Sequence, residues 1–296
     1  MSGIAFPSMP PGAAGREQRM APVAVERVRD DVHVAATDTL AVEEPLEIRL
    51  AYLQDGAQAH RSISITMRTP GHDAELACGF LFSEGIIHRR DEIAGVRACG
   101  FPTGSLGLRN TVRVTLAPHV SVDMARLERH FYTSSSCGVC GKTSLEALRV
   151  AGLQSIADPS FTISPGLIHQ LPQRLRQTQD VFEQTGGLHA AAMFDAEGAL
   201  LALREDVGRH NAVDKLIGSA LLADACPLAR RVLMLSGRAS FELVQKAIVA
   251  GIPVIAAVGA PSSLAVELAE QYQLTLIGFV RDRRFNIYSG FERVES

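Results

Sequence analysis

Residues 231–260 read RVLMLSGRASFELVQKAIVAGIPVIAAVGA, and this stretch indicates the fold class most directly. Two nearly continuous apolar runs enclose a helix-compatible segment, and short turns containing Gly separate the three. Such runs are typical of strands that helices cover on both faces of a sheet, and a strand–helix–strand unit sets its strands in parallel with a right-handed crossover. The pattern continues downstream. The expected elements are strands Arg231–Leu235, Pro253–Val258 and Leu274–Phe279 and helices Phe241–Ala250 and Leu264–Tyr272.

Upstream of this unit, the sequence predicts a hairpin and then, further back, a strand-rich region. The turn sequence Asp195-Ala196-Glu197-Gly198 separates His189–Phe194 from Leu200–Leu203, as in a β-hairpin. In the first half of the chain, apolar and polar residues alternate as they do in half-buried strands. We expect strands at Leu46–Leu50, Ile63–Met67 and Thr111–Leu116, and a helix at Asp73–Ser83.

Together these patterns predict an α/β protein (α+β overall) with two units and a tail. Residues 21–135 form the strand-rich α+β module, and residues 136–296 form the α/β domain, which carries a C-x-x-C loop at its start. Residues 1–20 are rich in Pro, Gly and Ala and are expected to be a disordered tail.

The composition of the 296 residues excludes several classes of function. Apolar residues make up 47% of the chain, which is typical of a globular protein. Acidic residues outnumber basic ones by 32 to 29, so no bulk positive field attracts nucleic acid or anionic lipid. The longest apolar stretch, Ala247–Ala260, is interrupted by Gly251 and Pro253 and is too short to span a bilayer. We therefore expect a cytoplasmic protein with no nucleic-acid or membrane partner.

Three expected strand ends point to a ligand site. Ligands of open α/β sheets bind beyond the carboxyl ends of the strands, where helix N-termini also point. The segments there are Ser236–Arg238, Gly259–Ser263 and Val280–Arg284, and their basic residues are Arg238, Arg281, Arg283 and Arg284. One such turn alone would be an ordinary connection with a solvated arginine. Three at one edge predict a ligand that carries phosphate, because Arg is suited to bidentate phosphate contacts.

A second polar concentration, Glu205–Asn211, follows a strand and opens a helix that runs to Leu222. Asn211 with Asp214 could be capping residues only. Asp206, Arg209 and His210 exceed what a cap requires, so contact with a ligand is the other interpretation.

The most reactive feature is the thiol pair Cys137 and Cys140 within Ser134–Ser144. A helix-compatible run follows, and the N-terminus of a helix favours thiolate over thiol. Lys142 adds a positive charge, and the neighbouring glycines leave both sulfurs little covered. This environment suits sulfur chemistry.

Other interpretations of the thiol pair fit less well. A closed zinc site needs four ligands, and the sequence offers one cysteine pair. A thioredoxin-type pair should follow a strand, whereas polar residues precede this one. Hydrolytic deaminases pair C-x-x-C with His-x-Glu, but Ala191 stands where His189 would need the glutamate. The interpretation that remains is a sulfur carrier, in which a cysteine holds the transferred sulfur atom as a persulfide. The other cysteines, Cys78, Cys99 and Cys226, are interpreted as ordinary core or surface residues.

The sequence resembles the formate dehydrogenase accessory sulfurtransferases, the FdhD family. The resemblance covers nearly everything after residue 20 and includes Ser135–Gly141, which reads Ser-Ser-Cys-Gly-Val-Cys-Gly. Further matching segments are Pro70–Leu76, Gly79–Gly85, Thr185–Ala191, Glu205–Lys215, Ser236–Arg238, Ala260–Val266 and Gly278–Arg281.

This resemblance implies a fold, a function and partners. The fold would be cytidine-deaminase-like, with three layers and a smaller N-terminal module. The protein would be a cytoplasmic homodimer that takes persulfide sulfur from a cysteine desulfurase. It would pass the sulfur to the molybdenum or tungsten of a bis-molybdopterin guanine dinucleotide cofactor, which the formate dehydrogenase catalytic subunit needs. A guanine nucleotide such as GDP would mimic part of that cofactor.

The resemblance also assigns residues. Cys137 would carry the persulfide and Cys140 would assist it as relay or resolving thiol, without a bound metal. The stretch that would contact the cofactor contains Phe279, Val280, Arg281, Asp282, Arg283 and Arg284. The strand ends and the Glu205–Asn211 segment add Arg238 and His210 as candidates for the same contact. Two alternatives are a chaperone that binds the cofactor without sulfur transfer and a zinc hydrolase on a deaminase scaffold.

Overall fold

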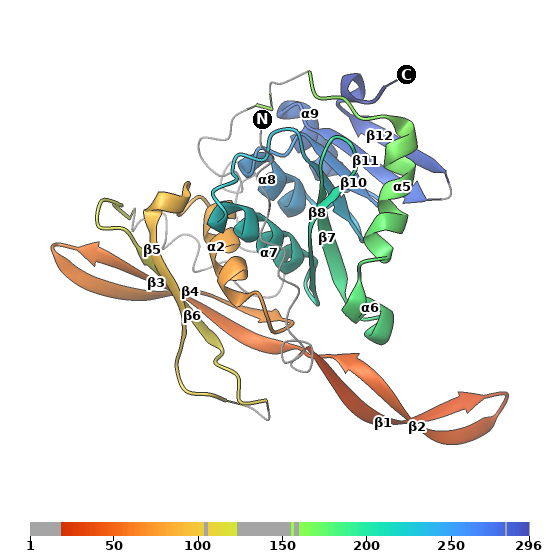
Figure 1. Cartoon of the computed structure of the whole chain (residues 1–296), viewed down its shortest axis with the longest axis horizontal. Helices are drawn as coiled ribbons and strands as arrows, with labels where there is room; N and C mark the ends of the chain where they lie inside the picture. Colours follow the sequence, from red (N-terminus) through yellow and green to blue (C-terminus); the bar gives the residue numbers. More distant parts are fainter. Residues whose placement is uncertain (1–18, 104–105, 123–154, 157–159, 282, 296) are drawn as a thin grey trace.

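The computed structural model describes residues 19–103, 106–122, 155–156, 160–281 and 283–295. These residues form a mixed α/β fold with three sheets and six α-helices (Figure 1). Within this part of the chain, no helix is both long and apolar enough to cross a membrane.

The largest sheet has six strands in the order β12-β11-β10-β9-β7-β8. The three central strands are parallel, β7 is antiparallel to β9, and each outer strand is antiparallel to its neighbour. The predicted strand–helix–strand unit and the predicted hairpin are therefore confirmed. The strands are β7 (His189–Phe194), β8 (Leu200–Asp206), β9 (Val232–Leu235), β10 (Val254–Ala257), β11 (Thr275–Arg281) and β12 (Arg284–Ser289).

Helices cover both faces of this sheet, because side chains along each strand alternate between two cores. On β7, Ala191 and Met193 join the core formed with α7 (Arg209–Leu222), α8 (Phe241–Val249) and α9 (Ser263–Gln271). The alternate residues Ala190 and Ala192 join the core formed with α5 (Pro165–Arg176). A short helix, α6 (Asp180–Thr185), precedes β7.

The first module contains a four-stranded sheet in the order β4-β3-β6-β5 and the helix α2 (Asp73–Ser83), which begins and ends where the sequence predicts. Val112, Val114 and Leu116 of β6 are buried on one face, as their alternation predicts. That face shares one core with α2 and with the α7 side of the large sheet. The strands are β3 (Glu44–Gln54), β4 (Ala57–Arg68), β5 (Ile93–Cys99) and β6 (Thr111–Leu116).

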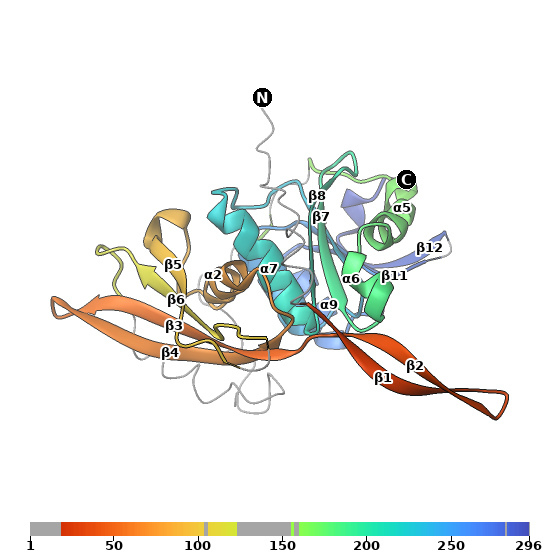
Figure 2. The same cartoon turned by 60° about the horizontal axis from the view of Figure 1, so that its bottom comes forward.

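A third sheet, which no sequence pattern predicted, is a long hairpin of β1 (Met20–Arg29) and β2 (Val32–Ala41). It extends away from the body of the molecule (Figure 2). β1 begins at Met20, the last residue of the expected tail. Residues 1–18 of that tail lie outside the described residues. The expected domain boundary at 135–136 lies outside them as well.

The last expected strand is longer than predicted. β11 does not end at Phe279 but continues to Arg281, and it pairs with a further antiparallel strand, β12, that the sequence analysis did not predict. The alternation of Phe285 and Ile287 with polar residues was the available signal for this strand.

Candidate functional site

The turns that follow β9 and β10 lie against each other, as the sequence predicted, and the second of them also contacts β11 near its carboxyl end. The Gly259 amide donates a hydrogen bond to the Gly237 carbonyl (3.0 Å), and the Phe279 amide donates one to the Gly259 carbonyl (3.2 Å). A Cβ on Gly259 would lie 3.0 Å from the backbone of Arg238, so a small residue is needed at this contact. Arg238 itself is exposed at the edge.

Four basic side chains gather at this edge: His189 at the start of β7, Arg209 and His210 at the start of α7, and Arg238 after β9. Burial lowers the pKa of His189 below its usual 6.5. The charges of Arg209, His210 and Arg238 lower this pKa further, and the charge of Asp206 opposes them. The edge is therefore locally cationic although the whole chain is slightly acidic.

Arg209 has a hydrogen-bond donor that is not used within the described part of the chain. Its Nε atom is buried and makes no hydrogen bond within the described part of the chain. A buried donor without an acceptor is costly, so this atom would gain from an anionic ligand.

His210 lies beside the N-terminus of α8. Its Nε2 atom is 3.3 Å from the hydroxyl of Ser240, which precedes that helix, and 3.7 Å from a carboxylate oxygen of Glu242. The hydrogen bond with His210 lowers the pKa of Glu242 to about 2. Helices α7, α8 and α9 all begin at this edge, and their positive dipole ends favour anions there.

The predicted cofactor stretch is divided between core and surface. Val280 is buried in the α5-side core, so its side chain is turned away from the edge. Phe279 has a positive φ of 55°, and the Arg281 guanidinium lies 5.9 Å from the centroid of its ring. Arg281, Arg283 and Arg284 are exposed on the β11–β12 hairpin. Asp282 lies outside the described residues.

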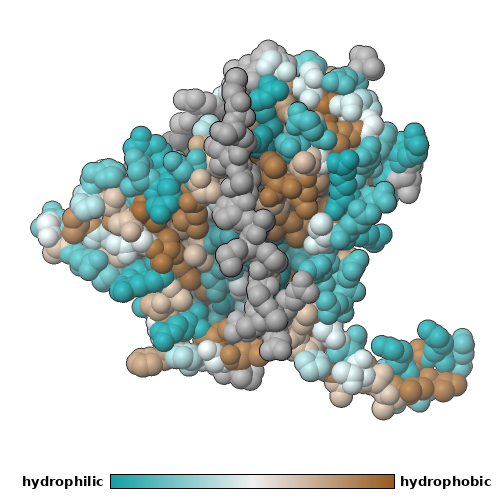
Figure 3. All heavy atoms as spheres, in the orientation of Figure 1, coloured by the Kyte–Doolittle hydropathy of each residue, from teal (hydrophilic) through white to brown (hydrophobic). Residues whose placement is uncertain are grey.

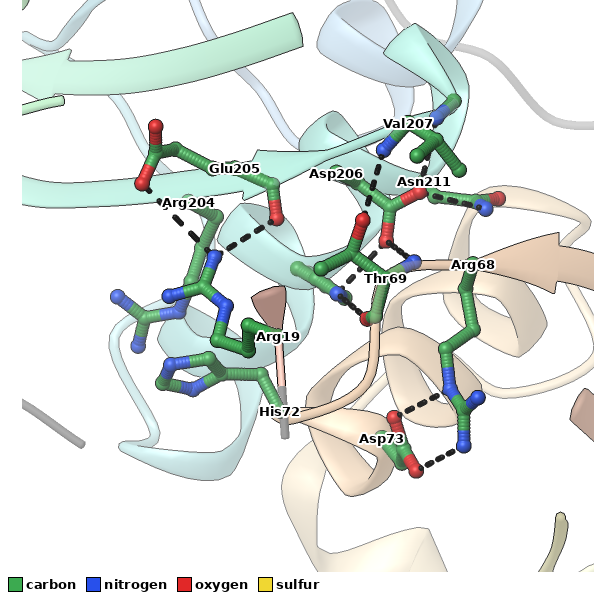
Figure 4. Close-up of polar contacts among 12 residues, drawn as sticks. Arg19, Arg68, Thr69, His72, Asp73, Arg204, Glu205, Asp206, Val207 and Asn211 are labelled. Atoms are coloured by element: carbon green, nitrogen blue, oxygen red, sulfur yellow. Dashed lines mark hydrogen bonds and ion pairs between the residues drawn. The ribbon is translucent and has the colours of Figure 1, made fainter. Parts of the chain in front are cut away.

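A buried network fixes the loop that carries Arg209 and His210 (Figure 4). Asp206 is fully buried and accepts hydrogen bonds from the Gly208 amide (2.8 Å), the Asn211 side chain (3.1 Å) and the Thr69 amide (3.3 Å). The Lys215 ammonium group lies 2.7 Å from Asp206 and donates to the Thr69 carbonyl (2.8 Å). Two segments that resemble the family, near residues 70 and 206, thus meet in space.

The interpretation of Asn211 and Asp214 as caps is wrong, because no side chain caps α7. Asn211 donates to the Met67 carbonyl (2.7 Å) and accepts from Thr66 (3.2 Å), so it binds the loop to β4. Asp214 is buried and accepts from Lys246 at 2.7 and 2.9 Å and from Ser83 at 2.9 Å. Both side chains therefore connect α7 of the second unit to the first module, Asn211 through β4 and Asp214 through α2.

Three further ion pairs lie beside this network, and sequence reasoning missed all three. Two of them join residues more than a hundred positions apart, whereas Arg68 and Asp73 are five positions apart but belong to different elements. Glu205 lies 3.8 Å from Arg19 and accepts from the amides of Val181 and Phe182. Arg68 forms a bidentate pair with Asp73 (Figure 4). Arg204 forms another with Glu75, which also contacts His72.

The predicted reactive thiols, Cys137 and Cys140, lie outside the described residues. The remaining cysteines behave as interpreted. Cys78 is buried in the core, and burial raises its pKa to about 12. Burial also raises the pKa of Cys226 to about 12, while Cys99 is partly exposed on β5. The described residues contain no group of three His, Cys, Asp or Glu side chains arranged to bind a metal ion.

Comparison with known proteins gives consistent matches. The model of the FdhD/NarQ family matches residues 41–295. The sulfur carrier protein FdhD of Streptomyces avermitilis is 52% identical over 272 residues, which cover 91% of this chain and 94% of the relative. The sulfur carrier protein FdhD of Mycobacterium tuberculosis is 48% identical to this chain, and the match covers 91% of this chain and 96% of the relative.

A solved structure from Desulfotalea psychrophila, described as a formate dehydrogenase accessory protein, has a similar fold. Its TM-score is 0.72 at 25% identity, and the match covers 94% of this chain and 100% of that chain.

Proposed function

Because the chain belongs to the FdhD/NarQ family, we propose that it is a cytoplasmic sulfurtransferase that serves formate dehydrogenase. It takes sulfur from a cysteine desulfurase and passes it to the molybdenum or tungsten of bis-molybdopterin guanine dinucleotide. The observation that carries this proposal is the cationic edge beyond β9, β10 and β11, where Arg209 retains a buried donor without an acceptor in the described part of the chain.

The acceptor would bind at that edge through its phosphates. Arg238 and Arg209 supply guanidinium groups, and the N-termini of α8 and α9 supply amides and dipoles. We include His210 and the stretch Phe279–Arg284 in this contact, because the ring of Phe279 and the guanidinium of Arg281 offer stacking surfaces for guanine. GDP carries the guanine and the pyrophosphate and is therefore a suitable probe.

Sulfur would travel on Cys137. Its thiolate attacks the outer sulfur of the persulfide on the desulfurase, the S–S bond breaks, and the desulfurase leaves as a thiolate. The product is Cys137–S–SH. Cys140 can then attack the inner sulfur, which forms a Cys137–Cys140 disulfide and releases sulfide to the metal; a cellular dithiol reduces the disulfide afterwards. If Cys140 instead takes the outer sulfur, it acts as a relay.

We also assign the second unit to the cytidine-deaminase-like folds. The support is the order of its strands: the hairpin β7–β8 is followed by three parallel strands in sequence, with helices on both faces of the sheet.

Intact-mass analysis after incubation with a cysteine desulfurase and cysteine tests the sulfur step. The wild-type protein should gain the mass of one sulfur atom, and Cys137→Ala should gain none. Cys226→Ala is the matched control, because that thiol is partly buried and its pKa is raised to about 12. Normal loading of Cys137→Ala, or its normal activation of formate dehydrogenase, would refute the proposal. A protein that binds GDP but never gains sulfur would be a chaperone for the cofactor.

Calorimetric titration with GDP tests the binding edge. Arg238→Ala should weaken binding roughly tenfold, because a hydrogen bond to a charged group contributes about 1.5–3 kcal/mol. Arg231→Ala is the control, since that arginine precedes the same strand at its opposite end. If Arg238→Ala and Arg231→Ala bound GDP with equal affinity, the nucleotide would not bind at the edge that carries Arg238.

A further inference from the structure

The β1–β2 hairpin, which we call the arm, is a separate two-stranded sheet that projects from the body (Figures 1 and 2). Its antiparallel register runs without interruption from Met20↔Ala41 to Arg29↔Val32. At ~3.4 Å per residue, ten residues give an arm about 34 Å long. A two-stranded sheet by itself is marginally stable in water, so an arm of this length needs a surface to pack against.

One face of the arm, called its apolar face below, carries most of the larger apolar side chains of the two strands. Because the register is regular, residues opposite each other share a face and successive residues alternate between faces. One face therefore carries Ala21, Val23, Val25, Val32, Val34, Ala36 and Leu40. Four of the larger side chains are 38–61% exposed, namely Val23, Val32, Val34 and Leu40. The other face carries the polar residues Glu26, His33, Thr37 and Thr39. Its apolar residues are Val28, Met20 at the base, and the small side chains of Pro22, Ala24, Ala35 and Ala41. Apolar surface on the arm is visible in Figure 3.

The charges on the apolar face are opposite at its two ends. Arg27 and Arg29 lie towards the tip, whereas Asp38 lies opposite Val23 near the base. The pair Val25↔Ala36 lies between them, so a twofold axis through this pair would exchange the basic end and the acidic end. Two copies of the arm that stack antiparallel thus bring unlike charges together.

We propose that this face binds the same face of a second copy of the chain. The two arms stack antiparallel about a twofold axis near Val25 and Ala36, with Arg27 and Arg29 of one copy over the half of the arm that carries the partner's Asp38. Apolar side chains interdigitate between the two sheets, as in other face-to-face sheet packings. This assigns an interface to the homodimer that the family resemblance implies, and it does not depend on sulfur transfer.

The base of the arm is fixed to the body beside the candidate site. The Val42 amide donates to the Arg19 carbonyl (2.9 Å), and the buried Arg19 side chain is paired with Glu205, next to Asp206. The arm therefore leaves the body at a set place. Stacked arms alone bury less than the ~1,200 Å² of a standard interface, so we expect a dimer whose dissociation depends on concentration.

Sedimentation velocity over a concentration series tests the interface. The wild-type chain should dimerise, and Val34→Asp, which buries a charge in the stack, should raise the dissociation constant at least about tenfold. Thr37→Asp adds the same charge on the opposite face and should leave it unchanged. A wild-type chain that stays monomeric throughout, or a Val34→Asp dimer of wild-type strength, would overturn the proposal.

Two further measurements test the arrangement. Arg27→Asp and Asp38→Arg should each weaken the dimer, and the double variant should regain affinity. Ala36→Cys, near the axis, should form a disulfide-linked dimer on oxidation, whereas Ala35→Cys, on the other face, should not. Equal crosslinking of both, or no recovery in the double variant, would exclude this stacking. Sulfur loading of the Val34→Asp chain separates the two proposals, because loading by a monomer leaves the sulfurtransferase function standing.

Discussion

Gly79 of α2 and Gly218 of α7 lie at the crossing of these two helices, each against the backbone of the other. A Cβ on Gly79 would lie 1.8 Å from the Asp214 carbonyl oxygen, and a Cβ on Gly218 would lie 1.9 Å from the Glu75 carbonyl oxygen. Neither helix has room for a methyl group here. The first module is thus packed backbone to backbone on the second, within one continuous core.

Substitution of either glycine should therefore be severe. Gly79→Ala and Gly218→Ala each place a methyl group against backbone atoms that cannot rotate away, so the helices must separate. We expect a loss of about 3 kcal/mol or more in the free energy of unfolding, at the upper end of overpacking effects. Urea denaturation followed by circular dichroism measures it.

Gly166→Ala is the matched control. Gly166 lies in α5, and a Cβ there would meet no atom within 4 Å. Ala is preferred over Gly in helices by about 0.5–1 kcal/mol, so this variant should be neutral or more stable. If all three variants unfolded at the same urea concentration, the close helix crossing would be wrong.

Local patterns were sufficient to predict the central elements. The βαβ rhythm from Arg231 onwards and the helix at Asp73–Ser83 depend on periodicity and on charges in the first turn, and the structure contains both. The convergence of Arg238 with the turn at Gly259 follows from the rule that parallel strands end at one edge.

The features that the sequence did not reveal depend on contacts between distant residues. The pairs Arg204–Glu75 and Arg19–Glu205 join segments more than a hundred residues apart, and no local pattern marks their partners. The arm was missed because β1 and β2 pack on no core within the described part of the chain, so their alternation is weak. Asn211 resembled a cap in sequence, yet its partners are on β4.

The Asp206–Lys215 pair supports the loop that presents Arg209 and His210. Asp206→Asn keeps the shape but leaves the buried ammonium group of Lys215 without its counter-charge. Removing one partner of a buried pair costs about 3–5 kcal/mol, and we expect that loss of stability together with weaker GDP binding. The double variant Asp206→Asn/Lys215→Met should recover part of the stability. Additive losses in this double-mutant cycle would show that the two groups are not coupled.

Glu75 should make stability depend on pH. Burial alone would raise its pKa, but the hydrogen bonds from Arg204 and His72 outweigh burial and lower the pKa below its usual 4.5. The unfolded chain then binds more protons between the two values, so the stabilisation is fully present above pH 4.5 and is lost as pH falls through the folded value. At neutral pH, Glu75→Gln should cost about 1.5–3 kcal/mol, and the cost should shrink in acid.

Thermal or urea denaturation at a series of pH values measures the effect of Glu75. Glu267→Gln, on the exposed face of α9, is the control and should be within about 0.5 kcal/mol of wild type. A cost for Glu75→Gln that stays constant from neutral pH down to acid would show that its ionisation does not stabilise the fold.

His189 should make nucleotide binding depend on pH in the opposite direction. Burial and the neighbouring charges of Arg209, His210 and Arg238 hold its pKa below 6.5, so the imidazole of the free protein is neutral at neutral pH. A bound pyrophosphate offsets those positive charges and favours the imidazolium, so binding takes up a proton. Affinity for GDP should therefore rise as pH falls below 6.5, by up to about tenfold for each unit by which binding raises the pKa.

The phosphate of GDP also titrates, and the ratio of wild-type to His189→Gln affinity removes that contribution. A ratio that stays constant with pH would mean that His189 does not face the bound anion.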